Sequence, residues 1–172
     1  MKQPIVLTVI ADDKPGIVQR LSGVVHDYGG TWNQSSMTHL AGRFAGMLLG
    51  VVPTDQAEAC VDALEALDAE GLSVVVRLGD KTAAPETGPE YHLELVGNDR
   101  PGIMADITAV LSEHHVNVHG LETLVEGASM AGGNVFRAYA SLRLPEGADA
   151  TGIEEALEAI ADDLMVDVTF ER

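Results

Sequence analysis

One short motif with chemical potential occurs twice in the chain. The first copy reads Asp13-Lys14-Pro15-Gly16-Ile17 and the second reads Asp99-Arg100-Pro101-Gly102-Ile103, with the two aspartates 86 positions apart. Each copy follows an apolar run with strand character and precedes a segment whose apolar residues recur at helical spacing. The motif is therefore predicted to be a strand-to-helix turn that ends at a helix N-terminus.

The residue types of this turn suit the binding of a small anion. The N–H groups of a first helical turn lack intrahelical partners and attract groups such as a carboxylate. The aspartates are predicted to cap the helices, and the prolines to lie in the first turn. The glycines leave no side chain over the helix start, so another molecule can approach the backbone. The alternative is a plain helix start; the repetition in matching contexts favours a ligand-binding turn.

Other reactive patterns are weak. His114, His115 and His119 fall at a helix end and the following strand, without a carboxylate or cysteine to complete a ligand set, so no metal or cofactor is expected. Cys60 lies on an apolar helical stripe and is expected to be a small core residue. Acidic residues recur at helical spacing opposite this stripe, as on a solvated face. Without a nucleophile elbow, a phosphate loop or a Cys–His pair, no catalytic residue and no enzyme is predicted.

The composition excludes several classes of partner. The chain has 172 residues, 46% of them hydrophobic, and a formal net charge of −17, so it can bury real cores but repels nucleic-acid phosphates and anionic membranes. An effect on transcription would have to run through a protein partner. The single cysteine excludes an internal disulfide. The start of the chain does not have the pattern of a signal peptide, and no apolar run approaches the ~20 residues of a membrane span, so the cytoplasm is the expected compartment.

Periodicity predicts the order strand–helix–strand–strand–helix–strand, twice. In the first copy we expect strands at Ile5–Ile10, Thr31–Thr38, Arg43–Val52 and Leu72–Leu78, and helices at Ile17–Tyr28 and Asp55–Ala69. In the second copy we expect strands at Tyr91–Val96, Asn117–Val125, Asn134–Leu144 and Leu164–Phe170, and helices at Ile103–His115 and Gly152–Asp162. Thr54 or Asp55 is predicted to cap the second helix of the first copy. This is the α+β, ferredoxin-like βαββαβ arrangement, in which both helices lie on one face of a four-stranded antiparallel sheet.

The repeat also sets the expected domain boundaries. They are 1–78 for the first unit, 79–90 for a linker without periodicity, and 91–172 for the second unit. The offset between the copies changes from 86 to 92 after the second strand, which predicts a longer hairpin loop around 126–133 in the second copy.

The two copies differ on the sheet face that the helices leave open. First-copy strands are apolar on both faces, as in Ile5–Ile10 and Val74–Val76, whereas second-copy strands alternate apolar and polar residues. A strand that is apolar on both faces is normally covered on both. The open face of the first unit is therefore predicted to be buried against something, and that of the second unit less so.

Paired βαββαβ units with Asp-Lys-Pro-Gly-Ile and Asp-Arg-Pro-Gly-Ile at the first turn resemble tandem ACT domains. The layout, two such domains and no catalytic domain, is similar to that of the glycine cleavage system transcriptional repressor family. The second-strand segment of the first copy, 31–37, keeps Ser35 of that family's pattern but departs from it at Thr31, Trp32 and Ser36. The second copy has Leu121 where the serine would be.

The resemblance implies that ACT units pair edge to edge or face to face and bind amino acids at the junction. Backbone amides of the turn would hold the ligand carboxylate, and the second strand of the neighbouring unit would hold its ammonium group. By position, the implied contacts are Asp13, Lys14, Pro15, Gly16 and Ile17 facing the second copy, Asp99, Arg100, Pro101, Gly102 and Ile103 facing the first, and Asn33, Ser35, His119 and Leu121 on the facing strands.

The favoured hypothesis is a non-enzymatic, homodimeric sensor of a small amino acid such as glycine. It would signal to a protein partner, such as a transcriptional activator of glycine catabolism. The alternative is a regulatory subunit that docks on an amino-acid metabolic enzyme through the apolar sheet face of the first unit. An acylphosphatase-type enzyme is a weaker third possibility. Such an enzyme needs an arginine at the first turn, and Arg100 is the one arginine in either motif. RNA binding does not fit a negative chain with 4% aromatic residues.

Overall fold

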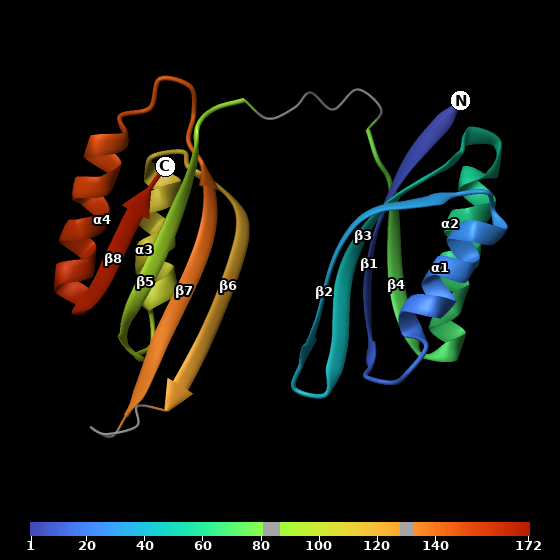
Figure 1. The fold of residues 1–172 in the computed structure, drawn as a ribbon, viewed down its shortest axis with the longest axis horizontal. Helices are drawn as coiled ribbons and strands as arrows, with labels where there is room; N and C mark the ends of the chain where they lie inside the picture. Colours follow the sequence, from blue (N-terminus) through green and yellow to red (C-terminus); the bar gives the residue numbers. More distant parts are fainter. Residues whose placement is uncertain (81–86, 128–132) are drawn as a thin grey trace. The chain divides into compact units, whose positions relative to one another are not determined.

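The computed structural model of the protein describes residues 1–80, 87–127 and 133–172. The chain forms two compact units, Met1–Ala84 and Pro85–Arg172, and each is described by itself (Figure 1). The middle of the predicted linker and of the long hairpin loop lie outside the described residues. The predicted boundaries of the first unit (1–78), the linker (79–90) and the second unit (91–172) stay a prediction.

Unit 1 is a four-stranded antiparallel sheet with its helices on one face (Figure 1). The strand order is β2-β3-β1-β4. The elements in chain order are β1 (Lys2–Asp12), α1 (Ile17–Asp27), β2 (Thr31–Leu40), β3 (Arg43–Pro53), η1 (Thr54–Gln56), α2 (Ala57–Glu65), η2 (Ala66–Glu70) and β4 (Leu72–Leu78).

Unit 2 repeats this topology in the order β6-β7-β5-β8. Its elements are β5 (Glu90–Asn98), α3 (Ile103–Glu113), β6 (Asn117–Gly127), β7 (Asn134–Arg143), α4 (Ala150–Leu164) and β8 (Val166–Glu171). The predicted α+β, ferredoxin-like class is confirmed for both units. Among the described residues, no helix combines the length and the apolar composition that crossing a membrane requires.

Each unit has its own core between the sheet and the helices. In unit 1, alternate residues of β1 such as Ile5 and Leu7 meet Leu21 of α1 and Leu64 of α2, all of them 0% exposed. The same layer in unit 2 contains Leu95, Ile107 and Leu157. The apolar period of two in the strands and of 3.6 in the helices turns these residues toward one layer. The sequence could therefore predict the strands and helices from this periodicity.

Two predicted details of the second helix of unit 1 were wrong. The α-helix is shorter than 55–69 because its two ends are 3-10 turns, η1 and η2. Neither Thr54 nor Asp55 caps it: the residue at the N-cap is Gln56, and it makes no side-chain capping bond. The helical segment ends at Gly71, whose φ of 85° is a conformation that glycine adopts freely.

The open sheet faces differ as the sequence pattern indicated. On the open face of unit 1, the outward side chains of Ile10, Met47 and Val75 are 52%, 54% and 46% exposed. The open face of unit 2 includes charged residues such as Glu94 and Asp167. The apolar character of the first face is thus confirmed, and its burial stays a prediction.

Candidate functional site

The duplicated turn is built around a left-handed glycine in each unit. Gly16 and Gly102 are the N-cap residues of α1 and α3, with φ of 96° and 99°, and neither cap has a side-chain hydrogen bond. The first intrahelical bonds run from the Arg20 and Asp106 N–H groups to the Gly16 and Gly102 carbonyls, at 2.9 and 3.0 Å. The N–H groups that precede these bonds in the first helical turn have no intrahelical partner, which is the arrangement that an anion site requires.

The prediction that the aspartates cap the helices was therefore wrong. Asp13 and Asp99 lie three residues before the glycine caps, and the prolines directly precede those caps, outside the helix. The aspartate backbone instead joins the turn to the neighbouring hairpin: the N–H of Asp13 donates to the Gly42 carbonyl at 3.2 Å, and that of Asp99 to the Asn134 carbonyl at 2.8 Å. The motif needs glycine for its positive φ, since an L side chain is strained there.

The basic residue of each turn is bonded within its own unit. Lys14 Nζ donates to the Glu70 carbonyl oxygen at 3.2 Å, at the end of η2. Arg100 Nη2 donates to the Asp163 carbonyl oxygen at 3.4 Å, near the end of α4. In both units the cation thus reaches the carbonyl end of the second helical segment, where unpaired carbonyl groups attract positive charge. Lys14 and Arg100 therefore have a structural role, and their predicted contact with a ligand stays a prediction.

The other residues of the turns divide by exposure. Asp13, Pro15 and Gly16 are exposed, and so are their counterparts in unit 2. Ile17 and Ile103 are 3% and 2% exposed and belong to the cores, so only their backbone N–H groups are available to a ligand.

Sequence reasoning missed the hairpin tip beside the first turn. His39 Nε2 lies 3.6 Å from Asp13 Oδ2, and Arg43 forms an ion pair with Asp12. The pairing of β1 with β3 brings these residues to the turn; the only sequence signal was the positive charge next to the Ala41-Gly42 turn.

The second-strand candidates Asn33 and His119 occupy equivalent irregularities. The β2–β3 register shifts between Trp32 and Gln34, and the β6–β7 register shifts between Val118 and Gly120. A bulge of this kind re-aims one side chain. Asn33 Oδ1 accepts a hydrogen bond from Thr31 Oγ1 at 3.1 Å, and His119 Nε2 accepts one from Arg143 Nε at 3.2 Å.

Ser35 and Leu121 are equivalent positions with different surroundings. The Trp32 indole N–H donates to Ser35 Oγ at 3.1 Å, and Trp32 packs against the core of unit 1. Leu121 is 48% exposed and lies on β6, every residue of which is exposed. The second strands of both units are edge strands, so their backbone polar groups are open on one side.

Within one unit, the turn and the second-strand candidates do not meet. Ser35 is level with Leu48 and Leu7, whereas the turn begins beyond Asp12. Five residues of β1 separate the two levels, about 17 Å at the rise of a strand. The same separation holds in unit 2, where Leu121 is level with Leu93 and the turn follows Asn98. A ligand that touches both sets must therefore be shared between different units.

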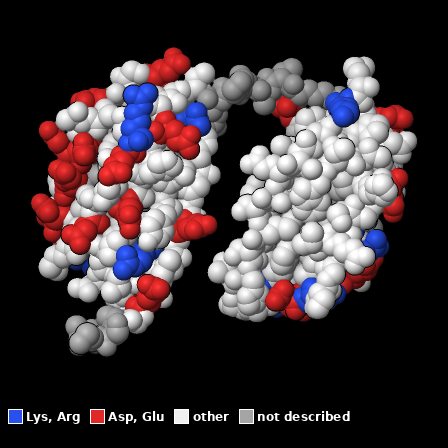
Figure 2. Space-filling model, in the orientation of Figure 1, with Lys and Arg blue, Asp and Glu red and all other residues white. Residues whose placement is uncertain are grey.

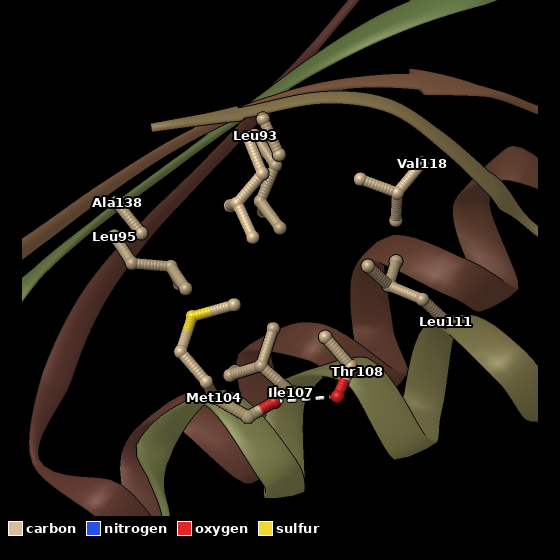
Figure 3. Close-up of a pocket in the computed structure, with 10 residues that line it drawn as sticks. Leu93, Leu95, Met104, Ile107, Thr108, Leu111, Val118 and Ala138 are labelled. Atoms are coloured by element: carbon tan, nitrogen blue, oxygen red, sulfur yellow. Dashed lines mark hydrogen bonds between the residues drawn. The ribbon is translucent and has the colours of Figure 1, made fainter. Parts of the chain in front are cut away.

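An apolar cavity of about 10 Å³ lies under β6 in unit 2, between the sheet and α3. Figure 3 shows Met104, Ile107 and Leu111 of α3 approaching strand residues such as Val118 across it. Thr108 also lines it, and its hydroxyl donates to the Met104 carbonyl at 2.6 Å, so the hydroxyl is already satisfied. The cavity holds about one water-sized sphere and is a packing defect more than a binding pocket.

An ion pair of unit 1 joins α1 to Glu70, the residue whose carbonyl group Lys14 of the turn contacts. Arg20 of α1 forms two hydrogen bonds with the Glu70 carboxylate, at 2.9 and 2.6 Å. This contact lowers the pKa of the Glu70 carboxyl, chiefly through the hydrogen bond to Arg20, and raises the pKa of Arg20. Glu70 therefore holds both α1, by its carboxylate, and the turn, by its carbonyl.

Reactive and metal-binding groups are sparse in the described parts of the chain. There, no three His, Cys, Asp or Glu side chains gather as a metal would require. Cys60 is 0% exposed in the core of unit 1, and burial raises the pKa of its thiol. Such a thiol is a poor nucleophile.

Two family models match the chain, both of them described as ACT domain, over residues 3–77 and 91–163. The chain belongs to the ACT-domain family. The first match spans the elements of unit 1, the second spans those of unit 2 up to α4, and the glycine-capped turn lies at the same place in each. The resemblance that the repeated motif indicated is thereby confirmed.

Some relatives are similar to the chain over most of their length. The chain is 23% identical over 162 residues to the glycine cleavage system transcriptional repressor of Escherichia coli (strain K12), covering 93% of this chain and 85% of that protein. A solved structure of an unknown protein from Galdieria sulphuraria is 28% identical, with a TM-score of 0.87, over 99% of this chain and 98% of that one. A putative glycine cleavage system transcriptional repressor has a TM-score of 0.69 at 17% identity, over 99% and 97%, which shows a shared fold.

Proposed function

We propose that this tandem ACT protein is a non-enzymatic, cytoplasmic regulator that binds a small amino acid and passes its occupancy to a protein partner. The observation that carries the proposal is the duplicated helix start with a left-handed glycine cap, exposed in both units. The distant similarity to the glycine cleavage system transcriptional repressor favours glycine catabolism as the regulated process.

The ligand carboxylate would lie on the free N–H groups at the start of α1 or α3. Its ammonium group would meet the second strand of another unit, near the bulge residue Asn33 or His119, because these strands do not reach the turn of their own unit. An exposed edge strand supplies carbonyl acceptors for such a group. The remaining members of the site, Ser35 and Leu121, differ in polarity, so the two sites would differ in ligand preference.

The protein partner would be a transcriptional activator or a similar regulator, since the charge of −17 makes direct contact with nucleic acid unfavourable. Binding of the amino acid alters the partner's affinity only if the ligand prefers one arrangement of the units.

Isothermal calorimetry of the full chain with glycine, serine and valine tests the ligand proposal. We expect saturable binding of at least one of them at millimolar concentration or below. Gly16→Asn and Gly102→Asn place a side chain over each helix start while keeping a residue that tolerates positive φ. Each should remove or weaken one site.

Gly147→Asn is the matched control, because Gly147 has a φ of 75°, open space around its Cβ position and no place in the proposed site. If binding survives both turn variants unchanged, or if none of the amino acids binds to the unmodified chain, the proposed function is wrong.

A further inference from the structure

A polar pocket of unit 2 lies at the opposite end of the sheet from the glycine-capped turn. Its volume is about 290 Å³, and its walls are formed by Thr87, His115, Asn117, Arg143, Leu144 and Pro145. Arg143 is level with Glu90 at the start of β5, whereas the turn follows Asn98 at the end of that strand. Eight residues of β5 separate the two levels, about 26 Å at the rise of a strand, so the pocket is distinct from the turn.

Hydrogen bonds fix the segment that leads into β5 against the end of β7. The Leu144 N–H donates to the Pro89 carbonyl at 3.0 Å, and Arg143 Nη1 donates to the Gly88 carbonyl at 3.4 Å. These contacts bring Thr87, which directly precedes Gly88, to the wall that Arg143 forms. The pocket thus combines residues from three separate parts of unit 2.

His115 has a left-handed backbone conformation where unit 1 has a glycine. Its φ is 56°, and its unit 1 counterpart, Gly29, has a φ of 68°. The two residues end their helices in the same way: the Gly29 N–H donates to the His26 carbonyl at 2.8 Å, and the His115 N–H donates to the Ser112 carbonyl at 3.0 Å. A side chain is disfavoured in this conformation, and such strain often marks a functional residue. The imidazole is therefore present in the pocket wall at the expense of backbone energy.

Unit 1 lacks this set of side chains at the matched positions. The residues equivalent to His115, Asn117 and Arg143 are smaller and uncharged: Gly29, Thr31 and Val51. The backbone pairing is nevertheless the same, because Thr31 lies opposite Val51 as Asn117 lies opposite Arg143. The fold therefore does not require an arginine, an amide and an imidazole at this end of the sheet.

Arg143 is a rare positive charge in an acidic unit. The basic residues of unit 2 are Arg100, Arg137, Arg143 and Arg172, and Figure 2 shows acidic groups predominating over the face of unit 2 that it draws. The Arg143 side chain is 26% exposed, with Nη2 3.6 Å from Glu90 Oε2 and Nε donating to His119 Nε2 at 3.2 Å. The Glu90 side chain is 54% exposed, and so open an ion pair is a weak competitor for a bound anion.

We propose that this pocket binds the phosphate group of a small molecule. Its walls contain a guanidinium (Arg143), an imidazole (His115), an amide (Asn117) and a hydroxyl group (Thr87), all of which can donate hydrogen bonds. A phosphate group has three terminal oxygens to accept them, one more than a carboxylate, and the planar guanidinium of arginine matches its geometry.

The remaining wall suits the carbon skeleton of a phosphate ester. Leu144 and Pro145 add apolar surface beside the donors, and the pocket is larger than a phosphate group alone. His115 and Asn117 are exposed, so a ligand can enter from solvent. The net charge of −17 opposes the binding of any anion, and we therefore expect millimolar affinity.

Isothermal calorimetry of the full chain with inorganic phosphate and with glycerol 3-phosphate tests the proposal. The ionic strength is held constant, because salt screens the repulsion from the acidic chain. We expect saturable binding of at least one probe in the millimolar range, and none of acetate. Tighter binding of the ester identifies a phosphorylated metabolite as the ligand class, whereas equal or tighter binding of phosphate identifies the free anion; both results support a phosphate site.

Variants at the pocket give changes of opposite sign. His115→Gly restores the unit 1 residue and removes the backbone strain, so the thermal unfolding midpoint of unit 2 should rise while phosphate binding weakens at least tenfold. Asn117→Thr, also the unit 1 residue, should weaken binding at least threefold. Glu90→Gln removes the competing carboxylate and should strengthen binding at least threefold.

His26→Ala is the matched control, because His26 is an exposed histidine at the end of α1 in unit 1. It should leave phosphate binding unchanged. Absence of binding of both probes at about 20 mM, equally tight binding of acetate, or unchanged binding in His115→Gly overturns the proposal. No amino acid is present and His115 is not part of the proposed amino-acid site, so these outcomes are independent of the ligand proposal.

Discussion

Trp32 and Val118 occupy equivalent positions in the second strands of the two units, each directly before a register shift. The sizes of their partners on the next strand compensate for this difference. The large Trp32 lies opposite Gly50, whereas the smaller Val118 lies opposite the fully buried Leu142. A large side chain beside a glycine in unit 1 thus replaces two medium side chains in unit 2. The two side chains of unit 2 do not fill the space completely, because the cavity of unit 2 lies beside Val118.

Replacing Trp32 with valine should destabilise unit 1 by about 2 kcal/mol, because Gly50 cannot fill the space that the indole leaves. Urea unfolding followed by circular dichroism measures the loss. Trp32→Phe keeps an aromatic ring but removes the hydrogen bond to Ser35, so it should lose less than half as much. Equal losses in the two variants would assign the stabilisation to that hydrogen bond and contradict the packing account.

Val118→Ile should stabilise unit 2 by about 0.5–1 kcal/mol, since one added methylene group enters an existing apolar cavity. Calorimetric unfolding of the full chain should show an increased midpoint for one transition. Val125→Ile is the control: Val125 is on the same strand and 51% exposed but does not line the cavity. A destabilised Val118 variant would mean that the cavity cannot accept a methylene group without strain.

The stability of unit 1 should decrease in acid through Glu70. Its pKa is lowered in the folded chain, so the carboxylate favours folding above its unfolded pKa, and this contribution is lost as pH falls through the lowered pKa. The fluorescence of Trp32, the sole tryptophan of the chain, reports unfolding of unit 1 alone.

Glu70→Gln should be less stable than the unmodified chain at pH 7, and the two should converge in acid. Glu58→Gln, on the exposed surface of α2, is the control. A difference between Glu70→Gln and the unmodified chain that does not change with pH would exclude the ion pair as its source.

Cys60 should be inert in the native chain. Its burial and raised thiol pKa predict that a thiol-specific disulfide reagent at pH 7 reacts slowly. Unfolding in urea should accelerate the reaction by about 100-fold or more. Rapid modification of the native chain would show that α2 opens readily from the sheet.

Gly16→Ala should destabilise unit 1 by about 1–2 kcal/mol although nothing lies within 4 Å of the added Cβ. The cost is backbone strain at a φ of 96°, and Gly16→Asn should recover part of it because asparagine tolerates the left-handed region. Chemical denaturation followed by Trp32 fluorescence measures both. If alanine is tolerated without loss, the turn adopts another conformation in solution.

The sequence by itself determined the architecture, because apolar periods of two and 3.6 leave few ways to bury the same residues and because the repeat shows every element twice. It also identified the turn at which a ligand is proposed to bind. The same pattern misidentified the cap: Asp-x-Pro-Gly is compatible with capping by aspartate or by glycine, and only the backbone angle at Gly16 and Gly102 distinguishes them.

Tertiary structure decided which residues meet across the chain. Strand pairing placed the register shifts at Asn33 and His119, a feature that depends on the neighbouring strand and has no local signal. Helix packing brought the Glu70 carbonyl to Lys14 and its carboxylate to Arg20, over separations of 56 and 50 residues. Local preference fixes an element's type, but contacts between distant residues arise only when the elements pack.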